Sequence, residues 1–171
     1  MRSVSVILFA LFAGIVPAIV SPSNALSQSA MAATEDLAQR ADVVVVGKVT
    51  EVRSEWSADR SRIYSHVTVL VDEHIKGVES QQSVVIATLG GEIDGVGEVY
   101  SHTARFKTDE QVIVFAAMDE RGELRVVGGD EGKLTVTKDK LTGLQVVADR
   151  ELLTAFKSRL KSVVQTQSHK E

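Results

Sequence analysis

The sequence contains no cysteine, and this absence excludes several kinds of site at once. Without a thiol there is no disulfide, no thiolate metal site, no cysteine nucleophile and no lipid attached to an N-terminal cysteine. A hydrophobic core must therefore stabilise the fold unaided, and a chain of 171 residues is long enough for one domain with such a core.

An excess of basic residues is also missing. The chain has 19 Lys and Arg against 23 Asp and Glu, which gives a formal net charge of −4 at pH 7. Nucleic-acid binding depends on clustered Lys and Arg that neutralise phosphates. We therefore expect no nucleic-acid partner.

Apolar runs long enough to approach a membrane span are confined to the N-terminus. Arg2 precedes an apolar run over residues 4–20, and Ser23-Asn24-Ala25 places small residues where a signal peptidase cleaves. We interpret residues 1–25 as a signal peptide, with Ala32 as a second cleavage position and an uncleaved anchor helix as the alternative. The mature chain is then exported to the periplasm or outside the cell, with residues 26–33 as a linker and no transmembrane segment.

The remaining sequence predicts a single, mainly β domain over residues 34–164. A short helix is expected first, with Leu37 and Ala41 on one face. Apolar and polar residues alternate over residues 63–75, which indicates a half-buried strand, and residues 110–118 are continuously apolar, which indicates a strand buried on both faces. Gly47 predicts a bulge or a bend in the first strand. Strands are expected at 43–52, 63–75, 83–89, 110–118, 123–127 and 133–136.

The spacing of these strands favours a small closed or partly open antiparallel barrel of OB-like form. A C-terminal amphipathic helix is expected to pack on the barrel. Its cap is Asp149, and its apolar face consists of Leu152, Phe156, Leu160 and Val163. We expect residues 165–171 to be disordered.

Several common catalytic and cofactor motifs are absent. His66 and His74 lie on one strand, roughly 26 Å apart, so they cannot share an ion, and no H-x-H or H-x-x-x-H pair exists. No serine stands in G-x-S-x-G, and the GGDEGK stretch (128–133) lacks the spacing of a P-loop. We expect no cofactor and no metal.

One glycine-rich stretch, LGGEIDGVGEVYSH (89–102), holds the remaining candidates for a site. It begins a dinucleotide-type turn but has Tyr100 where the third glycine belongs, so we interpret it as part of a long connection that folds over the barrel. The candidate binding residues in it are Glu92, Asp94, Tyr100 and His102. Trp56, expected at a hairpin tip, is a further candidate, either as an anchor for a partner or sugar or as packing for its own hairpin.

The order of several motifs resembles a group of small exported bacterial proteins without assigned activity. These motifs are ADVVVVGKV (41–49), Trp56, Ile75-Lys76-Gly77, Gly90-Gly91, Phe106 before the apolar strand, and VVGGDEGK (126–133). More distantly, the valine run with Gly-Lys-Val and the strand ending in Lys-Gly is similar to the netrin-like domains and tissue inhibitors of metalloproteinases, which implies an OB-type barrel.

The sequence departs from both groups in ways that limit what the resemblance implies. The inhibitors use an N-terminal cysteine and disulfides, so their inhibitory mechanism does not transfer to a chain without cysteine. In the bacterial group a Gly-Glu pair precedes the buried strand and a glutamine often precedes the late Gly-Lys. Here Asp109-Glu110 and Glu131 stand at these positions.

Three functions remain open at this point. The first is a non-enzymatic exported domain that binds another protein or an envelope ligand. The second is a small hydrolase or other enzyme with its site in the 89–106 loop, and the third is a structural envelope protein. The first two differ in whether Glu92, Asp94, Tyr100 and His102 converge on a pocket.

Overall fold

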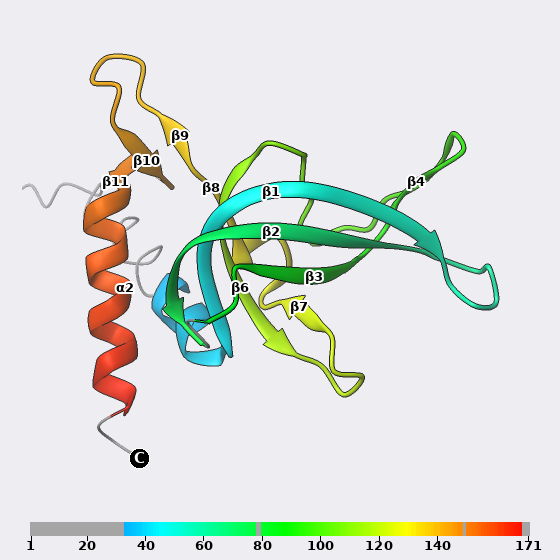
Figure 1. The fold of residues 1–171 in the computed structure, drawn as a ribbon, viewed down its shortest axis with the longest axis horizontal. Helices are drawn as coiled ribbons and strands as arrows, with labels where there is room; N and C mark the ends of the chain where they lie inside the picture. The colour runs from blue at the N-terminus through cyan, green and yellow to red at the C-terminus, as the bar shows by residue number, and fades with distance from the viewer. Residues whose placement is uncertain (1–32, 78–79, 149, 169–171) are drawn as a thin grey trace, which may run out of the picture.

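The structure is a computed structural model that describes residues 33–77, 80–148 and 150–168. This part of the chain is mainly β and forms a closed five-stranded barrel with a short helix at residues 33–40 and a C-terminal helix (Figure 1). The expected fold class is therefore confirmed. The predicted signal peptide and all but the last residue of the predicted linker lie outside the described residues. None of the helices in the described part is both long and apolar enough to cross a membrane.

Five strands close the barrel in the order β1, β2, β3, β7, β6 and back to β1. All neighbouring pairs are antiparallel except β3 and β7, which pair in parallel through Ile86 and Leu124. A sixth strand, β8, follows the 3-10 helix η1 and continues the sheet from β6. The bounds are β1 Val43–Trp56, β2 Ile63–Lys76, β3 Ser83–Leu89, β6 Gln111–Met118, β7 Leu124–Val126, η1 Gly129–Gly132 and β8 Lys133–Thr135.

In the described part of the chain, five further short strands lie outside the barrel, and none of them was predicted. Two of them form a hairpin, β4 (Gly91–Ile93) with β5 (Val96–Glu98). The other three form a small sheet beside the C-terminal helix: β9 (Thr137–Lys138), β10 (Gln145–Val147) and β11 (Glu151–Leu152) (Figure 1).

Two apolar clusters lie on opposite sides of the β1 and β6 strands. One fills the barrel and consists mainly of valine and isoleucine. The other lies between the barrel wall and the helices, and it includes the aromatic rings of Phe115 and Phe156. Because both faces of β6 are covered, Val112 to Ala116 are all buried, as the continuous apolar run predicts.

Gly47 gives β1 the predicted bulge. The register between β1 and β2 shifts between Val46 and Gly47, and a Cβ at Gly47 would lie 2.3 Å from the carbonyl oxygen of Leu70. Only glycine allows the two backbones to approach this closely. With further register shifts nearby, the two long strands curve around the barrel and extend beyond it (Figure 1).

The C-terminal helix α2 spans Leu153–Ser168, and two predictions about it were wrong. Leu152 belongs to β11 and is 43% exposed, so the buried face begins one residue later. It consists of Leu153, Phe156 and Leu160, followed by Val164 rather than Val163. The period of 3.6 residues places these four side chains on one stripe.

The second wrong prediction concerns the expected disordered tail. Residues 165–168 continue α2. The expected cap, Asp149, and residues 169–171 lie outside the described residues.

Candidate functional site

The glycine-rich stretch 89–102 contains a β-hairpin, although a continuous loop was predicted there. Asp94 and Gly95 connect β4 to β5, with φ angles of 50° and 81°. Two positive φ angles in a two-residue connection are the mark of a type I′ turn, for which Asp-Gly is a preferred sequence. The prediction of a loop was therefore wrong for residues 91–98, although a readable turn signal was present.

Gly91 lets this segment cross the β1–β2 pair at very close range, and Gly90 lets it pass close to Glu98 at the end of β5. Gly91 has a φ of 146°, and a Cβ there would lie 2.4 Å from the hydroxyl oxygens of both Ser54 and Ser65. At Gly90, with a φ of 89°, a Cβ would lie 2.7 Å from the carbonyl oxygen of Glu98. These glycines are therefore explained by close backbone approach and not by a phosphate.

A chain of hydrogen bonds lies beneath this crossing. The buried Ser65 hydroxyl donates to the carbonyl oxygen of Gly90 at 2.7 Å, and it lies 3.0 Å from the Ser54 hydroxyl. Because Ser65 uses its only proton on Gly90, Ser54 must donate to Ser65. The Ser54 oxygen in turn lies 3.4 Å from the backbone N–H of Glu92, which donates to it.

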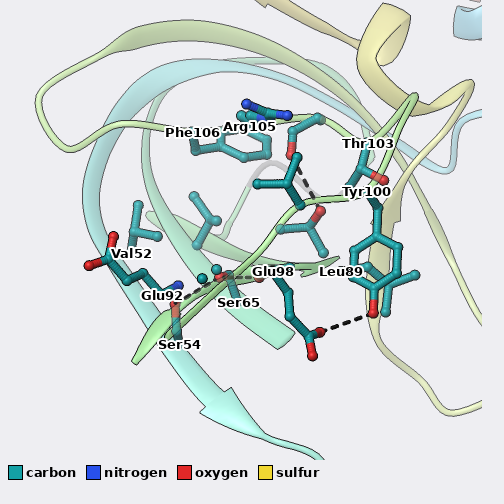
Figure 2. A pocket seen from close by; sticks show the side chains of 17 residues that line it. Val52, Ser54, Ser65, Leu89, Glu92, Glu98, Tyr100, Thr103, Arg105 and Phe106 are labelled. Atoms are coloured by element: carbon teal, nitrogen blue, oxygen red, sulfur yellow. Dashed lines mark hydrogen bonds between the residues drawn. The ribbon is translucent and has the colours of Figure 1, made fainter. Parts of the chain in front are cut away.

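Glu98 fixes the other strand of the hairpin. Its carboxylate accepts a hydrogen bond from the backbone N–H of Ile63 at 2.8 Å and another from the Tyr100 hydroxyl at 3.0 Å. Figure 2 shows the Tyr100 ring turned so that its hydroxyl meets this carboxylate. The same bond raises the pKa of Tyr100, because losing the proton would place two negative charges side by side.

These elements enclose a groove of about 440 Å³ at the mouth of the barrel (Figure 2). Its apolar lining includes Val52, Val67, Leu89 and Phe106. Phe106 also packs against the cluster inside the barrel, so the groove is continuous with the core below it. The volume lies within the range of about 300–1,000 Å³ typical of ligand pockets.

The groove offers binding surface without an assembled catalytic group. Its two serine hydroxyls bond to each other and to the backbone, and in the described part of the chain neither is hydrogen-bonded to an imidazole or a carboxylate. A serine nucleophile requires such a base. Over the same residues, no three His, Asp or Glu side chains gather as metal ligands would.

The predicted site residues are only partly brought together. Glu92 and Tyr100 line the groove, whereas Asp94 lies at the tip of the β4–β5 hairpin, away from it. His102 lines a neighbouring hollow with Asp130 and Lys133. Its backbone carbonyl accepts a hydrogen bond from the N–H of Asp130 at 3.2 Å.

Trp56 lies at the end of β1 and lines a separate hollow on the outer surface of the barrel. It takes no part in the groove.

Ser54, Ser65 and Glu98 were not among the binding residues predicted from the sequence. A signal for Ser65 was present, because it has the same parity as the buried Ile63 and Val67 in the alternating strand. A polar residue on a buried face needs a hydrogen-bond partner, which here is Gly90. The role of Glu98 depends on a contact with a residue 35 positions away and has no local signal.

Comparison with known proteins does not assign the groove. The sequence matches no family model, and no curated protein was found to be similar to it. The resemblance to netrin-like domains therefore stays a prediction, and the function has to be inferred from the geometry of the groove.

Proposed function

We propose that this protein is an exported, non-enzymatic binding domain whose barrel-mouth groove holds an apolar portion of another protein or of an envelope component. The supporting observation is an open apolar lining beside Ser54, Ser65 and Glu98, whose side chains are already hydrogen-bonded within the protein. Covering apolar surface yields roughly 25 cal/mol per Å². Binding there breaks none of the internal hydrogen bonds.

The barrel is proposed to be of OB type. Numbered in chain order, its five strands close as 1, 2, 3, 5, 4 and back to 1, which fits a small five-stranded Greek-key barrel. This agrees with the resemblance to netrin-like domains. It also agrees with a binding role, because such barrels present loops around a stable body.

The groove is tested by site-specific photocrosslinking in the producing cell. A photoreactive phenylalanine replaces Val99, which lines the groove and is 68% exposed, or Leu141, which is 89% exposed on the connection between β9 and β10. The expected result is a discrete crosslinked product from position 99 and none from position 141.

The second part of the photocrosslinking experiment uses a substitution that fills the groove. Val52 lies at the edge of the groove and is 36% exposed, so Val52→Trp occupies the space without opening the core. The product from position 99 should disappear in this variant. Equal products from both positions, or a product that survives Val52→Trp, would refute the groove as the binding site.

Export is tested separately by mass spectrometry of the protein recovered from the cell envelope. The expected N-terminus is Leu26, after cleavage behind Ala25. A chain that retains Met1 and stays in the cytoplasm would contradict export without affecting the groove.

A further inference from the structure

A second concave surface lies on the outer face of the barrel, between the end of the β1–β2 hairpin and the turn from β6 to β7. Its volume is about 490 Å³. At its centre, His66 on β2 pairs with Ala87 on β3, and Ala87 pairs with Arg125 on β7. Because the small side chain of Ala87 lies between two long side chains, the sheet surface has a depression there. We call this surface the Trp56 hollow.

Two aromatic residues line the Trp56 hollow. Trp56 is the last residue of β1 and pairs with Ile63, and Tyr64 is the next residue along β2. Both are partly exposed. The guanidinium of Arg125 lies over the Tyr64 ring, 5.8 Å from its centroid, so this ring is held in place from one side.

The charges that line the hollow balance. Three arginines and three acids take part, namely Arg62, Arg121, Arg125, Glu55, Asp59 and Glu123. A polyanion requires clustered and uncompensated basic residues, which this surface lacks. The balance favours an uncharged ligand.

Several of these polar groups are held in fixed positions. Arg125 contacts Asp119 at 2.6 Å and Glu123 at 2.8 Å, and the His66 Nε2 lies 3.1 Å from Glu55. A guanidinium has five N–H donors and a carboxylate has about four acceptor positions, so each retains hydrogen-bonding capacity beyond these contacts. The hollow therefore combines aromatic faces with preorganised donors and acceptors of both kinds.

We propose that the Trp56 hollow binds an uncharged oligosaccharide. The C–H face of a sugar ring packs against Trp56, and the sugar hydroxyls, each both donor and acceptor, bond to the arginines and acids around it. The site goes beyond the proposed function, since it lies on a different face from the groove. Either site can fail its test alone.

The sole tryptophan of the chain makes the test direct. The intrinsic fluorescence of the full mature protein is titrated with uncharged tetrasaccharides, namely the β-1,4-linked tetramers of glucose and of N-acetylglucosamine and the α-1,4-linked tetramer of glucose. A saturable change in Trp56 emission, with a millimolar or lower dissociation constant for at least one of them, is expected. No change with any tetrasaccharide would overturn the proposal. So would tighter binding of a tetrathymidylate than of every sugar.

Two matched arginine variants locate the site by calorimetry. Arg62 lines the hollow and makes no ion pair in the described part of the chain, whereas Arg60 lies in the same turn outside the hollow. Arg62→Ala should weaken binding about fivefold or more, and Arg60→Ala should leave it unchanged. Equal effects of the two would overturn the assignment.

Substitution of the aromatic anchor completes the test. Trp56→Ala should weaken binding about tenfold or more, and Trp56→Phe, which keeps an aromatic face, should retain part of it. Denaturant unfolding shows whether the hairpin stays folded in each variant. Wild-type affinity in a folded Trp56→Ala protein would refute the hollow as the sugar site.

Discussion

The two halves of strand β1 have different environments, although they belong to one continuous strand. Over residues 43–49 most side chains are buried, on one face inside the barrel and on the other under the helices. Over residues 50–56 no side chain is fully buried. There the strand extends past the barrel towards the groove and the Trp56 hollow.

The difference shows how the molecule separates stability from binding. The first half is held by apolar packing, which depends on area and volume more than on direction. The second half is held by directed hydrogen bonds at Ser54, Ser65 and Glu98 and by glycines at close contacts. Because these bonds stabilise the second half without covering it, apolar surface stays open to a ligand.

The largest expected effect lies in the packing under the helices. Phe156 is buried to 1% exposure between α2 and the barrel wall. Phe156→Ala should lower the free energy of unfolding by about 3–5 kcal/mol, because it removes apolar contacts and leaves a cavity. Urea unfolding measures this loss.

The matched control is the leucine that sequence spacing placed on the same face. Leu152→Ala should cost less than about 1 kcal/mol, because Leu152 is 43% exposed in β11. A loss as large as that of Phe156→Ala would mean that the helix packs in the register first predicted.

The next largest effect is expected at the glycine crossing. Gly91→Ala should destabilise the protein by about 3 kcal/mol, since it adds a clash with Ser54 and Ser65 to the strain of a positive φ. Gly95→Ala, also at a positive φ but with open space around it, should cost only about 1 kcal/mol. If the two variants lower the melting temperature equally, the close approach at Gly91 does not contribute to the stability of this half of β1.

The first half of β1 and its neighbours could be predicted from the sequence for a physical reason. A strand that is buried on both faces has a continuous apolar run, and a strand that is buried on one face alternates apolar and polar residues. The strands β1, β2, β3 and β6 can therefore be recognised from the local sequence. The strand β3 was predicted at its observed bounds, Ser83–Leu89.

The groove could not be predicted in the same way. It is built by contacts between residues far apart in sequence, such as Ser65 with Gly90 and Ile63 with Glu98. Of the candidate residues, Glu92 and Tyr100 fall into it because they flank the hairpin, while Asp94 is turned away by the type I′ turn. Local patterns give the elements but not their pairing across long loops.

A smaller effect is expected at the hydrogen bonds of Glu98. Glu98→Ala should cost about 1.5 kcal/mol, because it leaves the backbone N–H of Ile63 without its acceptor. Tyr100→Phe removes only the second bond to this carboxylate and should cost about half as much. Denaturant unfolding ranks the two, and a larger loss in Tyr100→Phe would contradict the role given to Glu98.

The smallest effect concerns an ion pair that joins α2 to the barrel in the otherwise apolar half. Glu73 contacts Lys157 and Lys161, both at 2.5 Å, and the hydrogen bond from Lys157 is the main cause of its lowered pKa. A lowered carboxyl pKa adds stability above the unfolded value of about 4.5, and this stability is lost as pH falls through the lower folded value. Glu73→Gln should therefore cost about 1 kcal/mol at pH 7 and progressively less below pH 4.5.

The control for this pair is Glu51→Gln, an exposed glutamate that makes no ion pair in the described part of the chain. It should change the free energy of unfolding by less than about 0.5 kcal/mol at either pH. If the cost of Glu73→Gln stays constant between pH 7 and about pH 3, the ion pair does not titrate with folding. The helix-covered half would then be held by packing alone, and the contrast between the two halves of β1 would be sharper than the contacts of Glu73 imply.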